Sequence, residues 1–160
     1  MNLSESFPER VKSFIKAANK NKVNMILVGG GAVNFHGFQR HSADIDFWVE
    51  LSKENIKNLI LALQELDYKL EDFPEKVKAG EQNISIKISP LFEIELITNF
   101  NPGKNFAQAF KDSVLVKKEG FSYHVLEFND LIKSKITSDR TKDKLDVEEL
   151  QKIKLRRKKN

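Results

Sequence analysis

Cysteine is absent from this chain, and so is any long run of apolar residues. Without cysteine the chain has no disulfide, no thiolate metal site and no cysteine nucleophile, which fits the cytoplasmic location that we expect. No apolar stretch approaches the roughly 18 residues that a transmembrane helix needs. The first residues have neither the basic start nor the apolar segment of a secretory signal. We therefore expect no membrane among the partners of this protein.

The positive charge of the chain is concentrated at one end. Of the 160 residues 40% are hydrophobic, enough for a buried core, and we expect one domain over residues 1–160 with a basic C-terminal helix end at 151–160. The net charge is +4, and much of it comes from this end. Such a cluster could contact nucleic acid through phosphate charge. The alternative, which we favour from the sequence, is a solvated helix end, where cations are also favourable.

Hydrophobic periodicity predicts alternating helices and strands. The expected helices are 7–20, 32–38, 53–66, 105–110, 127–138 and 141–155, and the expected strands are 23–28, 44–50, 83–89, 92–98, 113–117 and 123–126. Ser52 has the position of an N-cap. The order of these elements indicates an α/β or α+β fold with a mixed sheet.

Asp44 and Asp46 are separated by one residue on a predicted strand. Side chains alternate along a strand, so both carboxylates leave the same face, about 6–7 Å apart. Like charges this close repel unless a cation lies between them. Carboxylate oxygens favour Mg²⁺ or Mn²⁺ over zinc. The alternative is a solvated sheet face without metal, because Asp-x-Asp alone is a common pattern.

Two features precede the aspartates. The strand that ends at Val28 runs into Gly29-Gly30-Gly31, a pattern that lets backbone N–H groups approach a phosphate, or that simply makes a tight turn. Arg40 lies four residues before Asp44 and could pair with a phosphate, with the aspartates, or in a structural ion pair.

Other polar and aromatic residues near this segment are further candidates. Glu93 and Glu95 share a face of another predicted strand, and one of them could supply a third carboxylate. His36 and His41 could act as bases, although we favour supporting or surface roles. Trp48 could stack on a nucleobase, although core packing is the default expectation.

Taken together, these residues resemble a known signature. The segments Leu27-Val28-Gly29-Gly30-Gly31, Arg40 and Asp44-Ile45-Asp46-Phe47-Trp48 resemble the DNA-polymerase-beta-like nucleotidyltransferase superfamily. Similarity is greatest to the small bacterial branch that includes AbiEii-type toxins and lincosamide-type nucleotidyltransferases. Three later segments extend the resemblance over roughly residues 23–150. These are Ile94-Glu95-Leu96-Ile97-Thr98, Phe106-Ala107-Gln108-Ala109-Phe110, and Lys135 with Arg140, Asp143 and Asp146.

The resemblance implies a nucleotidyltransferase fold, a mixed central sheet flanked by helices, and a role for each matching residue. Asp44 and Asp46 would bind Mg²⁺ or Mn²⁺, and Glu95, at a position that is usually aspartate, would bind metal or deprotonate the acceptor. Gly29, Gly30, Arg40 and Lys135 would bind the nucleotide. Asp143 and Asp146 would hold Lys135 and Arg140, or, as we favour from the sequence, belong to an ordinary salt-bridged surface.

The implied activity is transfer of a nucleoside monophosphate from an NTP donor to an acceptor hydroxyl on a small molecule, a tRNA or a protein. The alternative is a catalytically inactive nucleotide- or metal-binding module that acts through partners, for example with an antitoxin in a toxin–antitoxin system. Substitution of Glu95 separates the two, because only an enzyme would lose turnover.

Overall fold

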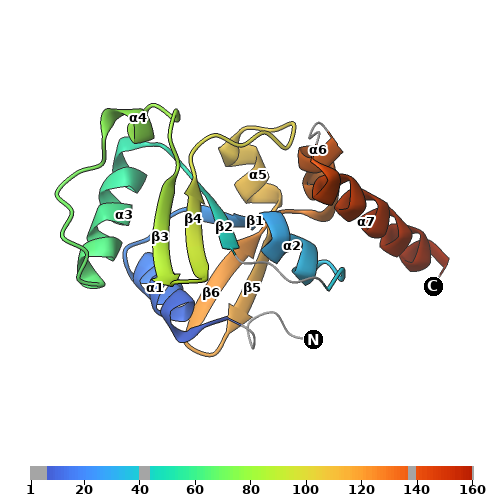
Figure 1. Ribbon diagram of the computed structural model, residues 1–160, viewed down its shortest axis with the longest axis horizontal. Coiled ribbons are helices and arrows are strands. Elements are labelled where there is room, and N and C mark those ends of the chain that lie inside the picture. The colour runs from blue at the N-terminus through green and yellow to red at the C-terminus, as the bar shows by residue number, and fades with distance from the viewer. Residues whose placement is uncertain (1–6, 40–43, 137–139, 160) are drawn as a thin grey trace.

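The computed structural model describes residues 7–39, 44–136 and 140–159 (Figure 1). Its helices are α1 (Glu9–Lys20), α2 (Gly29–Phe35), α3 (Lys53–Glu65), α4 (Glu75–Lys78), α5 (Phe106–Asp112), α6 (Phe128–Ile136) and α7 (Thr141–Lys159). Its strands are β1 (Met25–Val28), β2 (Asp44–Val49), β3 (Ile84–Ser89), β4 (Phe92–Ile97), β5 (Val114–Lys118) and β6 (Phe121–Val125).

The strands form one six-stranded sheet in the order β3-β4-β2-β1-β6-β5. The pairs β2/β4 and β1/β6 are parallel, and the other three pairs are antiparallel. The prediction of a mixed sheet flanked by helices is therefore confirmed.

The two faces of the sheet are covered differently. On one face Phe47 of β2 contacts Phe14 of α1, and α1 in turn packs against α3. On the opposite face Trp48 packs against Phe106 of α5. Since side chains alternate along β2, Asp44 and Asp46 lie on the Trp48 face. The carboxylates thus emerge on the face that α5 covers, away from α1 and α3.

Local sequence explains where the two long helices of the first half begin. Helix α1 starts after Pro8, and its residues Val11, Phe14, Ile15 and Ala18 are buried as the periodicity predicts. Helix α3 starts after Ser52, whose side-chain oxygen accepts a 3.1 Å hydrogen bond from the N–H of Asn55. The predicted N-cap is confirmed.

Several predicted boundaries differ from the structure, among them the end of α2, which lies at Phe35 and not at Phe38. Helix α2 begins at Gly29 and not at Ala32, because the positive φ of Gly29 (+59°) turns the chain directly from β1 into the helix. Strand β6 begins at Phe121, since it pairs with β5 up to the turn at Gly120. Helix α7 continues to Lys159, four residues past the predicted end. The single-turn helix α4 has no counterpart in the prediction.

A search of the described helices for a membrane-spanning segment finds none with the necessary length and apolar character.

Candidate active site

The register of β2 and β4 brings the predicted carboxylates together. Asp46 pairs with Glu95 across these parallel strands, and Val28, the last residue of β1, pairs with Asp46 from the other side. Residues paired in register share a face of the sheet, so Asp44, Asp46 and Glu95 project from the same face. Asp44 is exposed, whereas Asp46 and Glu95 are half-buried.

A polar pocket of about 270 Å³ opens over these carboxylates. All the predicted site residues line it except Arg40, which lies outside the described residues. The predicted residues in the lining are Gly29, Gly30, Asp44, Asp46, Glu95 and Lys135, joined by Asn83, Ile97, Arg140, Lys142 and Asp143. Glu93, the other candidate for a third carboxylate, is not part of this lining.

Asp46 is the carboxylate most affected by its surroundings. Burial raises its pKa to about 6, and the nearby charges of Asp44 and Glu95 push it in the same direction. Lys142 and Lys135 oppose this effect without cancelling it. The ionised form of Asp46 is therefore held at a cost that a bound cation would relieve.

Serine and asparagine side chains from β3 and the residue before it support the acidic wall. Ser85, which pairs with Glu95 across β3 and β4, donates a 2.5 Å hydrogen bond from its hydroxyl to Oε2 of Glu95. Oδ1 of Asn83 accepts a 3.0 Å hydrogen bond from the N–H of Thr98. Neither residue is predicted from the sequence. The alternation in strands 83–89 and 92–98 could have identified Ser85 through the hairpin register, whereas Asn83 carries no such signal.

Another wall is an ion-pair cluster between α6 and α7, buried except for Arg140. Nζ of Lys135 lies 3.0 Å from Asp143 and 2.9 Å from Asp146. Nε of Arg140 lies 2.7 Å from Asp143. The interpretation of the two aspartates as an ordinary salt-bridged surface is wrong, because Asp143 and Asp146 are 1% and 0% exposed. They hold Lys135 at the wall of the pocket and join α7 to α6.

Two other candidates lie elsewhere. His36 is buried, and its Nε2 donates a 2.8 Å hydrogen bond to the carbonyl oxygen of Leu126. Burial lowers the pKa of His36, which suits a neutral packing residue. Trp48 is buried against Phe100 and Phe106, with ring centroids 5.2 and 5.0 Å away, so core packing is what the structure shows. His41 is outside the described residues.

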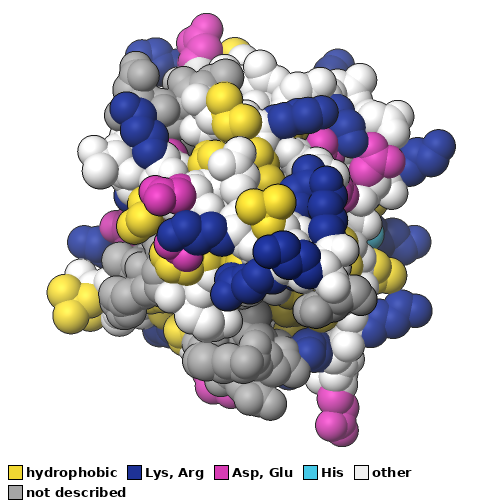
Figure 2. Space-filling view, turned by 90° about the vertical axis from the view of Figure 1, so that its right-hand side faces the viewer, with side chains coloured by type: hydrophobic (Ala, Val, Ile, Leu, Met, Phe, Trp, Pro, Cys, Tyr) yellow, Lys and Arg dark blue, Asp and Glu magenta, His cyan; other side chains and the backbone are white. Residues whose placement is uncertain are grey.

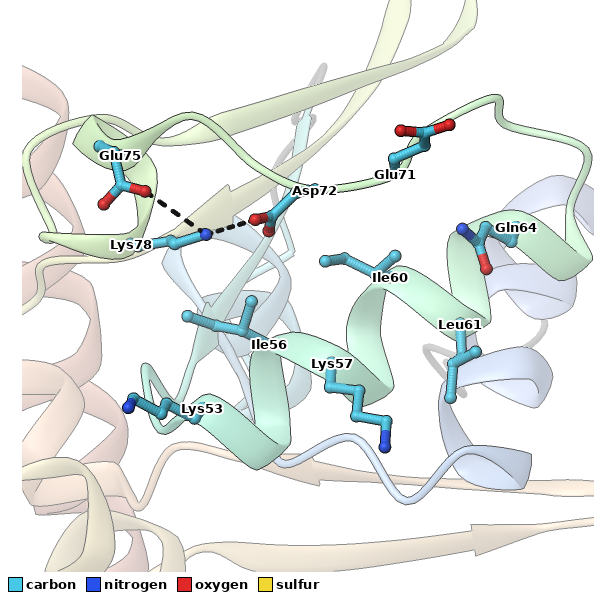
Figure 3. Close-up of a pocket in the computed structure, with 10 residues that line it drawn as sticks. All are labelled: Lys53, Ile56, Lys57, Ile60, Leu61, Gln64, Glu71, Asp72, Glu75 and Lys78. Carbon is cyan, nitrogen blue, oxygen red and sulfur yellow. Dashed lines mark hydrogen bonds and ion pairs between the residues drawn. The ribbon is translucent and has the colours of Figure 1, made fainter.

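A larger cavity, of about 630 Å³, lies away from the carboxylates, between α3 and residues 71–78 (Figure 3). Ile56 and Ile60 line it from α3, and Lys78 on its rim is paired with Asp72 and Glu75. None of the predicted site residues lines this cavity. The polar pocket over Asp46 is therefore the stronger candidate for chemistry, because it holds the predicted site residues.

Comparison with known proteins supports the fold and identifies the family. No curated protein matches the sequence. The fold is similar to the crystal structure of the lincosamide antibiotic adenylyltransferase LnuA bound to lincomycin, with a TM-score of 0.59 and 16% sequence identity over 92% of this chain and 98% of that one. Residues 9–155 match the family described as "Nucleotidyltransferase of unknown function (DUF6036)". With almost the whole chain inside this match, the protein belongs to that family of nucleotidyltransferases.

Proposed function

We propose that this protein transfers a nucleoside monophosphate from an NTP to an acceptor hydroxyl, with Asp44, Asp46 and Glu95 as the central groups. One observation carries the proposal. The β2/β4 register sets Asp46 beside Glu95 in a pocket that Gly29 and Gly30 also line. Carboxylates for a cation and a glycine turn for phosphates therefore line the same pocket.

The donor set fits Mg²⁺ or Mn²⁺ bound together with a nucleotide. No three carboxylate or imidazole groups within the described part of the chain converge tightly enough to hold a metal ion alone. Mg²⁺ does not need such a cage, since it is usually held by one or two carboxylates plus substrate phosphates and water. The raised pKa of Asp46 supports this assignment, because burial and the neighbouring carboxylates both disfavour its charged form, which a cation would stabilise. When bound, the cation would neutralise triphosphate charge and make the α-phosphorus more electrophilic.

The chain's own residues have defined tasks in this reaction. Glu95 accepts the proton of the acceptor hydroxyl, whose oxygen forms a bond to the α-phosphorus. The bond from that phosphorus to the bridging oxygen breaks, and pyrophosphate leaves. Lys135, held by Asp143 and Asp146, places its ammonium group at the pocket wall, and Arg140 adds a second cation there. Such charge acts mainly by stabilising the transferring phosphoryl group.

A thermal-shift titration with Mg²⁺ or Mn²⁺ and each of the four NTPs tests the proposal. A ligand at a hundred times its Kd adds about 2.7 kcal/mol to the free energy of unfolding. For a domain of this size, that raises Tm by about 5–10 °C. We expect a metal-dependent rise with at least one NTP, and its loss in Asp46→Asn.

Glu93→Gln is the matched control, because Glu93 lies two residues from Glu95 on the same face of β4 but does not line the pocket. It should keep the rise. If none of the four NTPs raises Tm, the proposal is contradicted. Glu95→Gln then separates an enzyme from an inactive nucleotide-binding module, such as one that acts with an antitoxin, because only the enzyme would lose transfer of labelled nucleotide while retaining the Tm rise.

A further inference from the structure

The basic C-terminal half of α7 does not line the site described above. Residues 150–159 contain six basic residues and no acidic one. The remainder of the chain holds 21 basic against 23 acidic residues, so the whole positive excess of the protein comes from these ten positions. A helix C-terminus is stabilised by cations in its last turn alone, and this basic half extends beyond it.

This basic half packs against the rest of the domain. Ile153 is buried, and Arg157 donates a 3.1 Å hydrogen bond from Nη2 to the carbonyl oxygen of His36. The guanidinium of Arg157 also lies 5.1 Å from the ring centroid of Phe128. The helix is consequently held in a fixed direction relative to α2 and α6.

Ile153 and Arg157 face the domain, and the residues around them on α7 include exposed cations. Arg156, Lys158 and Lys159 are exposed and take part in no ion pair within the described chain. Figure 2 shows Lys and Arg side chains gathered across the middle of the face from which α7 projects, with few acidic side chains between them.

The same helix begins at the polar pocket. Lys142 and Asp143 of its first turn line the pocket. From Lys142 to Lys152 the helix rises about 15 Å at 1.5 Å per residue. That distance matches about four nucleotides of a polynucleotide strand at 3.4 Å each.

The pocket itself limits what the acceptor can be. Its volume of about 270 Å³ is below the roughly 300–1,000 Å³ of a typical small-molecule site, and the triphosphate would occupy it. The body of the acceptor must therefore bind outside, and α7 is the charged surface that continues from the pocket.

We infer that the basic half of α7 binds the phosphodiester backbone of a polynucleotide whose terminal hydroxyl is the acceptor in the pocket. This inference rests on the proposed function for the transfer step and on α7 alone for binding. An anionic membrane fits less well, because the exposed large apolar residues of α7, Leu145 and Leu155, lie ten residues apart and form no continuous apolar face.

Fluorescence anisotropy without NTP tests the binding step. The probes are a labelled 12-nucleotide RNA and DNA of the same sequence, titrated with full-length protein at several KCl concentrations. The α7 variant Arg156→Gln/Lys158→Gln/Lys159→Gln removes three cations and leaves Arg157 in place. The matched variant Lys16→Gln/Lys53→Gln/Lys57→Gln removes three exposed cations from α1 and α3.

Each lost phosphate contact on a single strand reduces the salt slope by about 0.7. We expect the α7 variant to lose about two units of slope and about a hundredfold in affinity at 0.1 M KCl, and the matched variant to keep the wild-type slope. If the RNA and DNA probes bind with different affinities, the tighter probe identifies the class of polynucleotide. Equal losses in both variants would overturn the inference, as would tight α7-dependent binding to anionic vesicles or polyglutamate without binding to either polynucleotide.

A second measurement separates this inference from the proposed function. Labelled-nucleotide transfer is followed on acceptors of 3 and 12 nucleotides, with Asp46→Asn as the inactive control. The α7 variant should raise KM for the 12-mer and leave the 3-mer unchanged, because the 3-mer is too short to reach Lys152. If no acceptor is labelled while α7-dependent binding persists, the proposed transfer fails and the binding surface stands.

Discussion

A β-carbon at Gly29 would lie 2.3 Å from Oδ2 of Asp46. The backbone of the β1–α2 turn thus passes directly against the carboxylate that has the raised pKa, and only glycine leaves room for both. Gly29 also has φ +59°, a conformation that other residues adopt at a cost.

Gly29→Ala should therefore both destabilise the fold and displace Asp46. We expect a loss of about 1–2 kcal/mol in the free energy of unfolding from the left-handed backbone alone, and loss of the metal-dependent Tm rise with NTP. Gly103→Ala is the control, since Gly103 also has a positive φ (+88°) but a β-carbon there would meet only Lys133 at 3.8 Å. It should show a similar stability loss in urea unfolding and keep the Tm rise. Retention of the rise in Gly29→Ala would separate Asp46 from nucleotide binding.

The raised pKa of Asp46 predicts a specific pH dependence of stability. The folded-state pKa is about 6 against an ordinary value of 3.8, so the charged carboxylate destabilises the folded state above this range. Asp46→Asn removes that cost. In buffer with EDTA, the variant should match wild type below about pH 4, gain stability from pH 4 to 6, and stay more stable at higher pH by on the order of 3 kcal/mol.

Urea unfolding of both proteins from pH 4 to 8 measures this difference. Mg²⁺ with NTP should reverse the order, because the bound cation stabilises the charged form of wild type only. A difference that does not change with pH would mean that Asp46 has an ordinary pKa in the folded protein.

The sequence predicts the strands well because their apolar residues repeat with a clear period. Strands β1 to β4 all lie within one or two residues of their predicted bounds. The start of α2 is missed because Gly29, Gly30 and Gly31 have no periodic pattern, and α4 is missed because four residues are too few to show one. Propensity cannot reveal a turn that a positive φ makes possible.

The site is only partly predictable by physical reasoning. Alternation places Asp44 with Asp46 and Glu93 with Glu95, but only the strand order sets β2 beside β4, and only the resemblance selects Glu95. The burial of Asp146 cannot be predicted from the sequence for a different reason. An acidic residue among lysines looks like surface until Lys135 of α6 is seen to neutralise it.

The Lys135–Asp146 pair predicts a large effect of a small substitution. Both groups are buried, so Asp146→Asn leaves Lys135 with less compensating charge in a region where water has little access. We expect a loss of on the order of 3 kcal/mol in the free energy of unfolding, measured by urea titration. Glu149→Gln, which breaks an exposed pair with Lys152 on the same helix, should cost under about 1 kcal/mol. Equal effects would mean that burial does not strengthen the first pair.

Ser85 predicts a change in turnover without a matching change in stability. Its hydroxyl holds Oε2 of Glu95, whose side chain is one carbon longer than that of an aspartate and therefore has one more bond to restrain. A hydrogen bond to a charged group contributes about 1.5 kcal/mol, so Ser85→Ala should lower kcat about tenfold if that energy positions Glu95. Ser85→Thr retains the hydroxyl and should restore most of the rate, and Tm of both variants should stay within a few degrees of wild type. If Ser85→Ala instead lowers Tm strongly and leaves kcat unchanged, the hydrogen bond supports the β3–β4 hairpin and does not position Glu95.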